Sequence, residues 1–204
     1  VASSGNKFNL TNGAKLDVAT LTLGTGNNIT IDGTSQVSVT KLSGKGTINI
    51  DATNLTEDSK PIVGNASEFA GEIKVINNDN LKVIIDENGN VSIVEKVYVA
   101  QIGEDNKFET LQDAIDAANA TDVINVVSST TENITIAEND NITLTFSEGV
   151  TLNGYFAPFK GNLKINGGTI NNTNSGASAI EINAGKLNLE NVNISSARHA
   201  VRID

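Results

Sequence analysis

Short alternations of apolar and polar residues recur along this chain. Examples are Leu-Asp-Val at 16–18, Ile-Thr-Ile at 29–31 and Ile-Asn-Ile at 48–50. Because successive side chains of a strand point to opposite faces, each triplet predicts a short strand with one buried face. Clusters of Gly, Asn and Ser, which favour turns, separate the triplets. The pattern predicts an all-β chain, and the repeat length decides between a sandwich, a barrel and a solenoid.

The repeat is clearest near the C-terminus. Residues 163–172 align with residues 187–196, and a third strand follows in each copy, at 179–182 and at 200–203. The offset of about 21–24 residues lies in the range where self-similarity indicates a solenoid. Three short strands in each repeat predict one triangular coil of a parallel β-helix.

Turn residues recur with the same offset. Gly167 aligns with Asn191, and Gly and Asn are the two residues that most readily adopt a positive φ. Because a sharp corner between two strands requires such a residue, we expect the same corner in successive coils.

The N-terminal half repeats more loosely. Residues 14–32 resemble residues 35–51, and further strands are predicted at 72–76, 81–85 and 91–94. The intervening stretch, 58–70, is irregular and contains a proline at 61, so we predict a loop that leaves the coil.

One segment, residues 108–119, departs from the strand pattern. Its apolar residues have helical spacing and are Leu111, Ala114, Ile115 and Ala118. Thr110 is suited to cap the start of a helix and Asn119 to end it. A single amphipathic helix ahead of a run of strands predicts a cap, which covers both the apolar interior and the unpaired strand edge of a first coil.

Composition narrows the classes of function. The formal net charge is −10 and the isoelectric point is about 4.5, which argues against binding to nucleic acid or to anionic membranes. The chain has no Cys, which excludes disulfides, cysteine zinc sites and thiol nucleophiles. No apolar run is long enough to span a bilayer. The start has no signal sequence and the end interrupts a strand, so we expect a monomeric fragment of a longer protein.

The segment at 97–127, with its Ile-Gly turn and its F-x-T-L-x-D-A-I helix, resembles a segment of large surface proteins of gut-type Gram-positive bacteria. There it leads into a pectate-lyase-like, right-handed parallel β-helix, and the sequences at 133–154 and 185–194 are similar to coils of that family. The resemblance implies an extracellular, cell-surface location. We therefore expect the last coils of one β-solenoid in 1–96 and the helix-capped start of a second β-helix in 97–204.

Enzymes of this fold use Asp-rich calcium sites with a basic residue, or Asp clusters with a His, and neither pattern is present here. We predict no catalytic residue, no cofactor and no metal. One candidate contact cluster, Arg198, His199 and Arg202, surrounds the only His. Its cations could bind a carboxylate, or the cluster could be an ordinary corner and outer strand face, with His199 opposite Ser178 and Arg202 opposite Glu181.

Two further groups of residues are candidates for binding. Tyr155, Phe156 and Phe159 form the main aromatic cluster. They could stack on a carbohydrate, or they could pack against the helix or inside a bulged coil. The acidic and Asn-rich stretches at 104–106 and 138–141 could ligate Ca²⁺, although they lack a complete binding-loop spacing and solvated turns explain them as well.

Two functions remain open. The first is a non-catalytic structural or adhesive surface module that binds a host protein or glycan through its long side or a strand edge. The second is the N-terminal part of a polysaccharide lyase or glycoside hydrolase whose active site lies outside this fragment. The fold itself does not decide between them, since β-helices support both.

Overall fold

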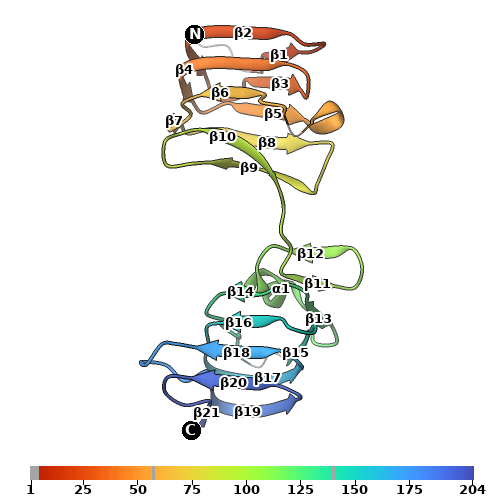
Figure 1. Cartoon of the computed structure of the whole chain (residues 1–204), viewed down its shortest axis with the longest axis vertical. Helices are drawn as coiled ribbons and strands as arrows, with labels where there is room; N and C mark the ends of the chain where they lie inside the picture. Colours follow the sequence, from red (N-terminus) through yellow and green to blue (C-terminus); the bar gives the residue numbers. More distant parts are fainter. Residues whose placement is uncertain (1–4, 57, 139–140) are drawn as a thin grey trace. The chain divides into compact units, whose positions relative to one another are not determined.

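The structure is a computed structural model that describes residues 5–56, 58–138 and 141–204. The chain divides into two compact units, Val1–Lys96 and Val97–Asp204 (Figure 1). Each unit has its own cluster of buried apolar residues. The predicted all-β class is confirmed, because the chain is a parallel β-solenoid with one helix.

Unit 1 is a solenoid with three strand faces. The first face stacks β1 (Lys7–Leu10), β3 (Asn28–Asp32), β5 (Thr47–Asp51) and β8 (Glu72–Ile76) in parallel. The other two faces share the long strands β2 (Lys15–Leu23) and β4 (Gln36–Gly44). The first part of β4 pairs with β6 (Ile62–Gly64), and its end pairs with β7 (Glu68–Phe69).

The prediction of a loop over residues 58–70 is wrong for its second part, which contains β6 and β7. Pro61 misled the prediction, because it lies just before β6, where its missing N–H is not needed by the ladder. Its carbonyl accepts a hydrogen bond from the backbone of Val37 at 2.7 Å. A short 3-10 helix, Ala52–Asn54, precedes this segment.

The last two strands of unit 1 depart from the solenoid. The strands β9 (Leu81–Ile85) and β10 (Val91–Glu95) were predicted, but they pair with each other in antiparallel register as a hairpin. Val83, Val91 and Ile93 of this hairpin pack on the buried cluster of the coils. The hairpin therefore closes one end of the unit 1 core.

Unit 2 repeats the three-faced coil. One face stacks β13 (Val123–Val126), β15 (Asn141–Phe146), the end of β17 (Phe156–Asn166) and the end of β19 (Ile180–Glu190). A second face stacks β14 (Thr130–Thr131), β16 (Thr151–Asn153), β18 (Thr169–Asn172) and β20 (Asn193–Ser196). The third face consists of the first parts of β17 and β19 with β21 (Val201–Ile203).

The registers confirm the repeats read from the sequence. Leu163 lies beside Leu187 and Ile170 beside Ile194 in adjacent coils. The predicted corner is confirmed too, since Gly167 has a φ of 74° and Asn191 a φ of 56°. Identical apolar positions stack from coil to coil, which produces columns of β-branched and leucine side chains along the core.

The helix α1 (Leu111–Ala117) lies within the predicted segment and is a cap, as expected. The hydroxyl of Thr110 accepts a hydrogen bond from the backbone N–H of Asp113 at 3.0 Å. Leu111, Ala114 and Ile115 are buried in the unit 2 core. The helix thus covers the open apolar end of the first coil.

One strand and one side chain satisfy the edge of that first coil, and a carboxylate of the coil binds the start of the helix. The strand β13 is paired by the antiparallel strand β11 (Ala100–Ile102), whose other partner is β12 (Asn106–Phe108). The carboxamide of Gln112 accepts from the backbone N–H of Thr135 at 2.8 Å and donates to its carbonyl at 3.0 Å. The carboxylate of Glu132 accepts the backbone N–H of Leu111 at 2.9 Å and that of Gln112 at 3.1 Å.

No helix within the described residues is long and apolar enough to span a membrane.

Candidate functional site

The face built by β14, β16, β18 and β20 presents a regular array of polar side chains. Alternation along each strand turns Leu152, Ile170 and Ile194 inward. The residues on either side of each of these apolar residues point outward, and they stack from coil to coil in two columns. These columns, called here the polar grid, are Ser129, Thr151, Thr169 and Asn193 in one, and Thr131, Asn153, Asn171 and Ser195 in the other.

Hydroxyl and carboxamide groups make up the whole polar grid, and none of its side chains is charged. All eight residues are exposed or partly exposed. Hydrogen bonds tie the rows together, because Asn171 Nδ2 donates to Asn153 Oδ1 at 3.1 Å and the backbone N–H of Thr151 donates to Ser129 Oγ at 2.9 Å. The array is therefore held in fixed positions by adjacent coils, whose strands β14, β16, β18 and β20 are stacked in Figure 1.

The other two faces of unit 2 differ, because charged pairs lie on them. Lys164 of β17 and Glu190 of β19 are 3.4 Å apart on one face. On the third face Arg202 lies 3.8 Å from Glu181 and 2.8 Å from Asp204. An uncharged face in a chain with a net charge of −10 is thus a distinct surface.

The Arg–His cluster lies at the last described corner of unit 2. As predicted, His199 lies opposite Ser178, with His199 Nδ1 3.5 Å from Ser178 Oγ, and Arg202 pairs in register with Glu181. Ser178 Oγ also donates to Glu181 Oε2 at 3.3 Å. Glu181, which the repeat places opposite Arg202, therefore contacts this cluster both through Arg202 and through the hydroxyl of Ser178.

This arrangement does not match a nucleophile activated by a base. In a hydrolytic triad the imidazole lies between the hydroxyl and the carboxylate, whereas here the hydroxyl of Ser178 lies between His199 and Glu181. Ser178 is also buried, with 2% of its surface exposed. Arg202 is paired with two carboxylates, and Arg198 donates to the carbonyl of Gly176 at 2.9 Å. These groups stabilise the corner of the coil.

The aromatic cluster is mostly internal. Phe156 and Phe159 are 0% and 2% exposed and belong to the unit 2 core, so they cannot stack on a ligand. The register of β17 shifts at both residues, which is the bulged coil anticipated as the alternative. Tyr155, just before them, is partly exposed.

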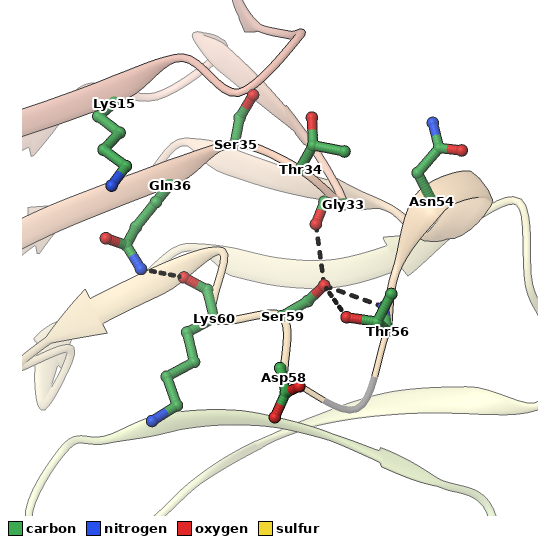
Figure 2. A pocket seen from close by; sticks show the side chains of 10 residues that line it. All are labelled: Lys15, Gly33, Thr34, Ser35, Gln36, Asn54, Thr56, Asp58, Ser59 and Lys60. Atoms are coloured by element: carbon green, nitrogen blue, oxygen red, sulfur yellow. Dashed lines mark hydrogen bonds between the residues drawn. The ribbon is translucent and has the colours of Figure 1, made fainter.

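Unit 1 has a cavity of about 340 Å³ at a corner where three coils meet (Figure 2). Ten residues line it: Lys15, Gly33, Thr34, Ser35, Gln36, Asn54, Thr56, Asp58, Ser59 and Lys60. Ser59 Oγ is its central fixed group, which donates to the carbonyl of Gly33 at 2.9 Å and accepts from the backbone N–H of Thr56 at 2.9 Å. Gln36 Nε2 donates to the carbonyl of Lys60 at 2.9 Å.

Side-chain-capped turns form this corner of unit 1. Asp32 accepts the backbone N–H and the hydroxyl of Thr34, at 3.0 and 2.8 Å, and Asp51 accepts the same two groups of Thr53. Hydrogen bonds, above all from Ser35 and then from the backbone of Asn12, lower the pKa of Asp32 from 3.8 to about 2. Hydrogen bonds, first among them the one from the hydroxyl of Thr53, lower the pKa of Asp51 as well.

Calcium binding gains no support from the described residues. Residues 139 and 140 of the candidate stretch at 138–141 lie outside them. Within the described part of the chain, no group of three His, Cys, Asp or Glu residues is placed to hold a metal ion.

Sequence reasoning missed the polar grid and the capped corner, although signals for both are present. The grid follows from the outward positions of aligned triplets, such as Thr-Leu-Asn at 151–153 and Thr-Ile-Asn at 169–171. The corner follows from an acidic or amide residue two positions before Thr or Ser, as in 32–34, 51–53 and 65–67.

Comparison of the chain with protein-family models, with curated proteins and with solved structures gives no match.

Proposed function

We propose that the chain is a non-catalytic adhesive module of a secreted or surface-attached bacterial protein, and that it binds a glycan through the polar grid. The observation that carries the proposal is the two-column array of uncharged hydroxyl and carboxamide groups on β14, β16, β18 and β20. The resemblance of residues 97–127 to surface β-helix proteins supports the extracellular location. Direct binding of a host protein is the alternative partner.

The spacing of the grid suits an extended neutral polysaccharide. Neighbouring rows are separated by about 4.8 Å and the two columns by about 6.6 Å, the distances of a parallel sheet. Sugar hydroxyls are both donors and acceptors, and so are the Thr, Ser and Asn side chains of the grid. A charged ligand would gain no ionic partner on this face, whereas a neutral chain could bridge several rows.

Solution NMR titration tests the proposal. Backbone amide shifts of the full chain are followed while cellohexaose, chitohexaose and mannohexaose are added in separate experiments. At least one of these neutral oligosaccharides is expected to shift amides of β16, β18 and β20. The double variant Thr151→Val/Thr169→Val keeps the branched side-chain shape and removes two hydroxyls, so it should raise the dissociation constant about ten-fold.

The matched control is Thr143→Val/Thr145→Val, because these two threonines project outward from β15 on another face of the same unit. The control should bind like the unaltered chain. Equal loss of binding in both variants, or no amide shift on the grid with any of the three oligosaccharides, would contradict the proposal. Appearance of shorter sugars during the titration would point to the enzyme alternative.

A further inference from the structure

One edge of the hairpin strand β9 is arranged to pair with a further strand. Among the described residues, β9 pairs with β10 and with no second strand. The backbone N–H of Asp86 donates to the carbonyl of Asn90 at 3.0 Å, so the pair that closes the hairpin is a hydrogen-bonded one. Because such pairs alternate along an antiparallel ladder, Leu81, Val83 and Ile85 direct their N–H and carbonyl groups away from β10.

This edge of β9 is apolar on both faces of the strand. Ile84 and Ile85 point to opposite faces and are each 42% exposed, and Val83 before them is partly exposed. By contrast β12, which ends a sheet of unit 2, exposes Asn106 and Lys107. Natural sheets use charged residues, prolines or bulges to keep an edge from pairing with another chain. The three apolar residues of β9 include none of these devices, so their edge favours pairing.

The sequence of this edge is complementary to itself. Residues 82–86 are Lys-Val-Ile-Ile-Asp, with one charge of each sign on either side of an apolar centre. Two identical copies can pair in antiparallel register about a two-fold axis at Ile84. Lys82 of each copy then lies opposite Asp86 of the other, and apolar residues lie opposite apolar residues, which are the cross-strand pairs that stabilise a sheet.

Neighbouring registers do not give this match. The outward backbone groups of β9 belong to every second residue, so the two-fold axis must pass through a residue for these groups to meet. An axis at Lys82 would place two like charges opposite each other. An axis at Val83 would place Lys82 opposite Ile84, and an axis at Ile85 would place Ile84 opposite Asp86. The axis at Ile84 therefore fits best.

We infer that unit 1 joins two copies of the chain through β9, in antiparallel register with the two-fold axis at Ile84. The hairpins of the two copies then form one four-stranded sheet, in which the outward backbone groups of Val83 bond those of Ile85 across the axis. A single strand pair buries much less than the roughly 1,200 Å² of stable complexes, so the dissociation constant is on the order of 0.1 mM. This dimer differs from the monomer predicted from the sequence.

Sedimentation velocity of the full chain tests the dimer. The weight-average sedimentation coefficient should rise as the protein concentration increases from about 10 µM to about 1 mM. Ile84→Lys places two like charges at the axis, so it should raise the dissociation constant about ten-fold or more. The matched control is Ser92→Lys, because Ser92 is exposed opposite Ile84 in β10. This control should associate like the unaltered chain, and circular dichroism checks that both variants are folded.

A disulfide cross-link tests the register, since the chain has no Cys. Residues at the axis form a non-hydrogen-bonded pair whose Cα atoms are about 4.5 Å apart, a distance that a disulfide can span. Ile84→Cys should therefore form a covalent dimer when oxidised glutathione is added. Ser92→Cys is also exposed on the same face of the hairpin. Its two copies would be about 15 Å apart in the dimer, so it should stay largely monomeric.

Four outcomes would overturn the inference. They are a sedimentation coefficient that stays constant up to about 1 mM protein, equal association of Ile84→Lys and the unaltered chain, no covalent dimer of Ile84→Cys, and equal cross-linking of both cysteine variants. The glycan titration reads amides of unit 2, whereas these experiments alter only the hairpin of unit 1. Dimerisation and glycan binding can therefore fail separately.

Discussion

At the scale of single residues, the corners of unit 1 depend on short side chains that replace backbone partners. In the turn that begins at Asp32, one carboxylate holds the backbone and hydroxyl of Thr34 within its own coil and the backbone of Asn12 in the preceding coil. The carboxylate thus fixes both the turn and the stacking of two coils. Ionised oxygens accept such bonds better than neutral ones do.

The stability of unit 1 should depend on pH through this residue. Because the folded pKa of Asp32, about 2, lies below its ordinary value, the ionised form contributes stability above about pH 4. This contribution is lost as the pH falls through about 2. Denaturant unfolding at several pH values should show a smaller acid loss for Asp32→Asn, which keeps an acceptor oxygen but no charge. Asp17→Asn, at an exposed position on β2, should leave the acid profile unchanged.

Glycine is required where one corner passes directly over another. Gly185 has a φ of 107° and pairs with Gly161 of the preceding coil, and a Cβ at Gly185 would overlap the carbonyl oxygen of Gly161. We expect Gly185→Ala to lower the free energy of unfolding by about 2–4 kcal/mol. Gly103→Ala, which also has a positive φ but meets open space, should cost about 1 kcal/mol. Similar losses for the two variants, measured by denaturant unfolding, would refute the steric argument.

At the scale of elements, a side chain in the cap of unit 2 makes the hydrogen bonds that a neighbouring strand would otherwise make. Ile134 directs its backbone groups toward the following coil, where its N–H donates to Tyr155 at 2.8 Å. The backbone groups of Thr135 therefore face the side that no coil covers. The carboxamide of Gln112, which carries one donor and one acceptor like a peptide group, satisfies both of them.

Loss of this side chain should loosen the cap more than its partly exposed position suggests. Gln112→Ala leaves the N–H and carbonyl of Thr135 to water, and we expect a decrease of about 1–2 kcal/mol in the stability of unit 2. Hydrogen exchange should show faster exchange in α1 and at Thr135. Glu104→Gln, at an exposed turn, serves as the comparison; equal exchange rates in both variants would argue against the strand-like role.

The sequence predicts strands and their stacking far better than it predicts the ends of the solenoids. Alternation and the repeat offset place Leu163 beside Leu187 because parallel coils bring identical positions together. Alternation is the same in parallel and antiparallel strands, so it could not show that β9 and β10 form a hairpin. Helical spacing identified α1, but the pairing of Gln112 with Thr135 depends on a fold-back that no local pattern contains.

The candidate site was less predictable, for a related reason. Aromatic residues are rare in this chain, which made Phe156 and Phe159 candidates for ligand contact. Both are buried at a bulge of β17 and belong to the core. The polar grid consists of common residues whose significance arises only when coils stack. Its chemistry is collective, and no single residue such as Thr151 or Asn171 signals it.

At the scale of the whole chain, the two units have separate cores. The buried residues of one cluster run from Leu10 to Ala66, and those of the other from Val99 to Ile182. Each core is a column of mostly aliphatic layers, and every layer contacts the layers of the neighbouring coils. Such solenoids gain stability from adjacent repeats.

Replacement of a large buried side chain by a small one should therefore lower the stability of only the unit that contains it. Leu144 is fully buried in unit 2. We expect Leu144→Ala to lower the free energy of unfolding of that unit by about 2–5 kcal/mol. Hydrogen exchange resolved along the sequence should show faster exchange across residues 97–204 and unchanged exchange across residues 5–96. Ile31→Ala provides the reciprocal case in unit 1, and a uniform change along the chain would contradict independent cores.

The stacking of the polar grid has a consequence for how such a surface can change over evolutionary time. Each coil adds one row of two outward side chains and pairs only with its neighbours. Duplication of a coil in the gene would lengthen the grid by about 4.8 Å without rearranging the existing rows. The number of coils would then set the length of this surface. A point mutation in one row would alter the side-chain chemistry of that row alone.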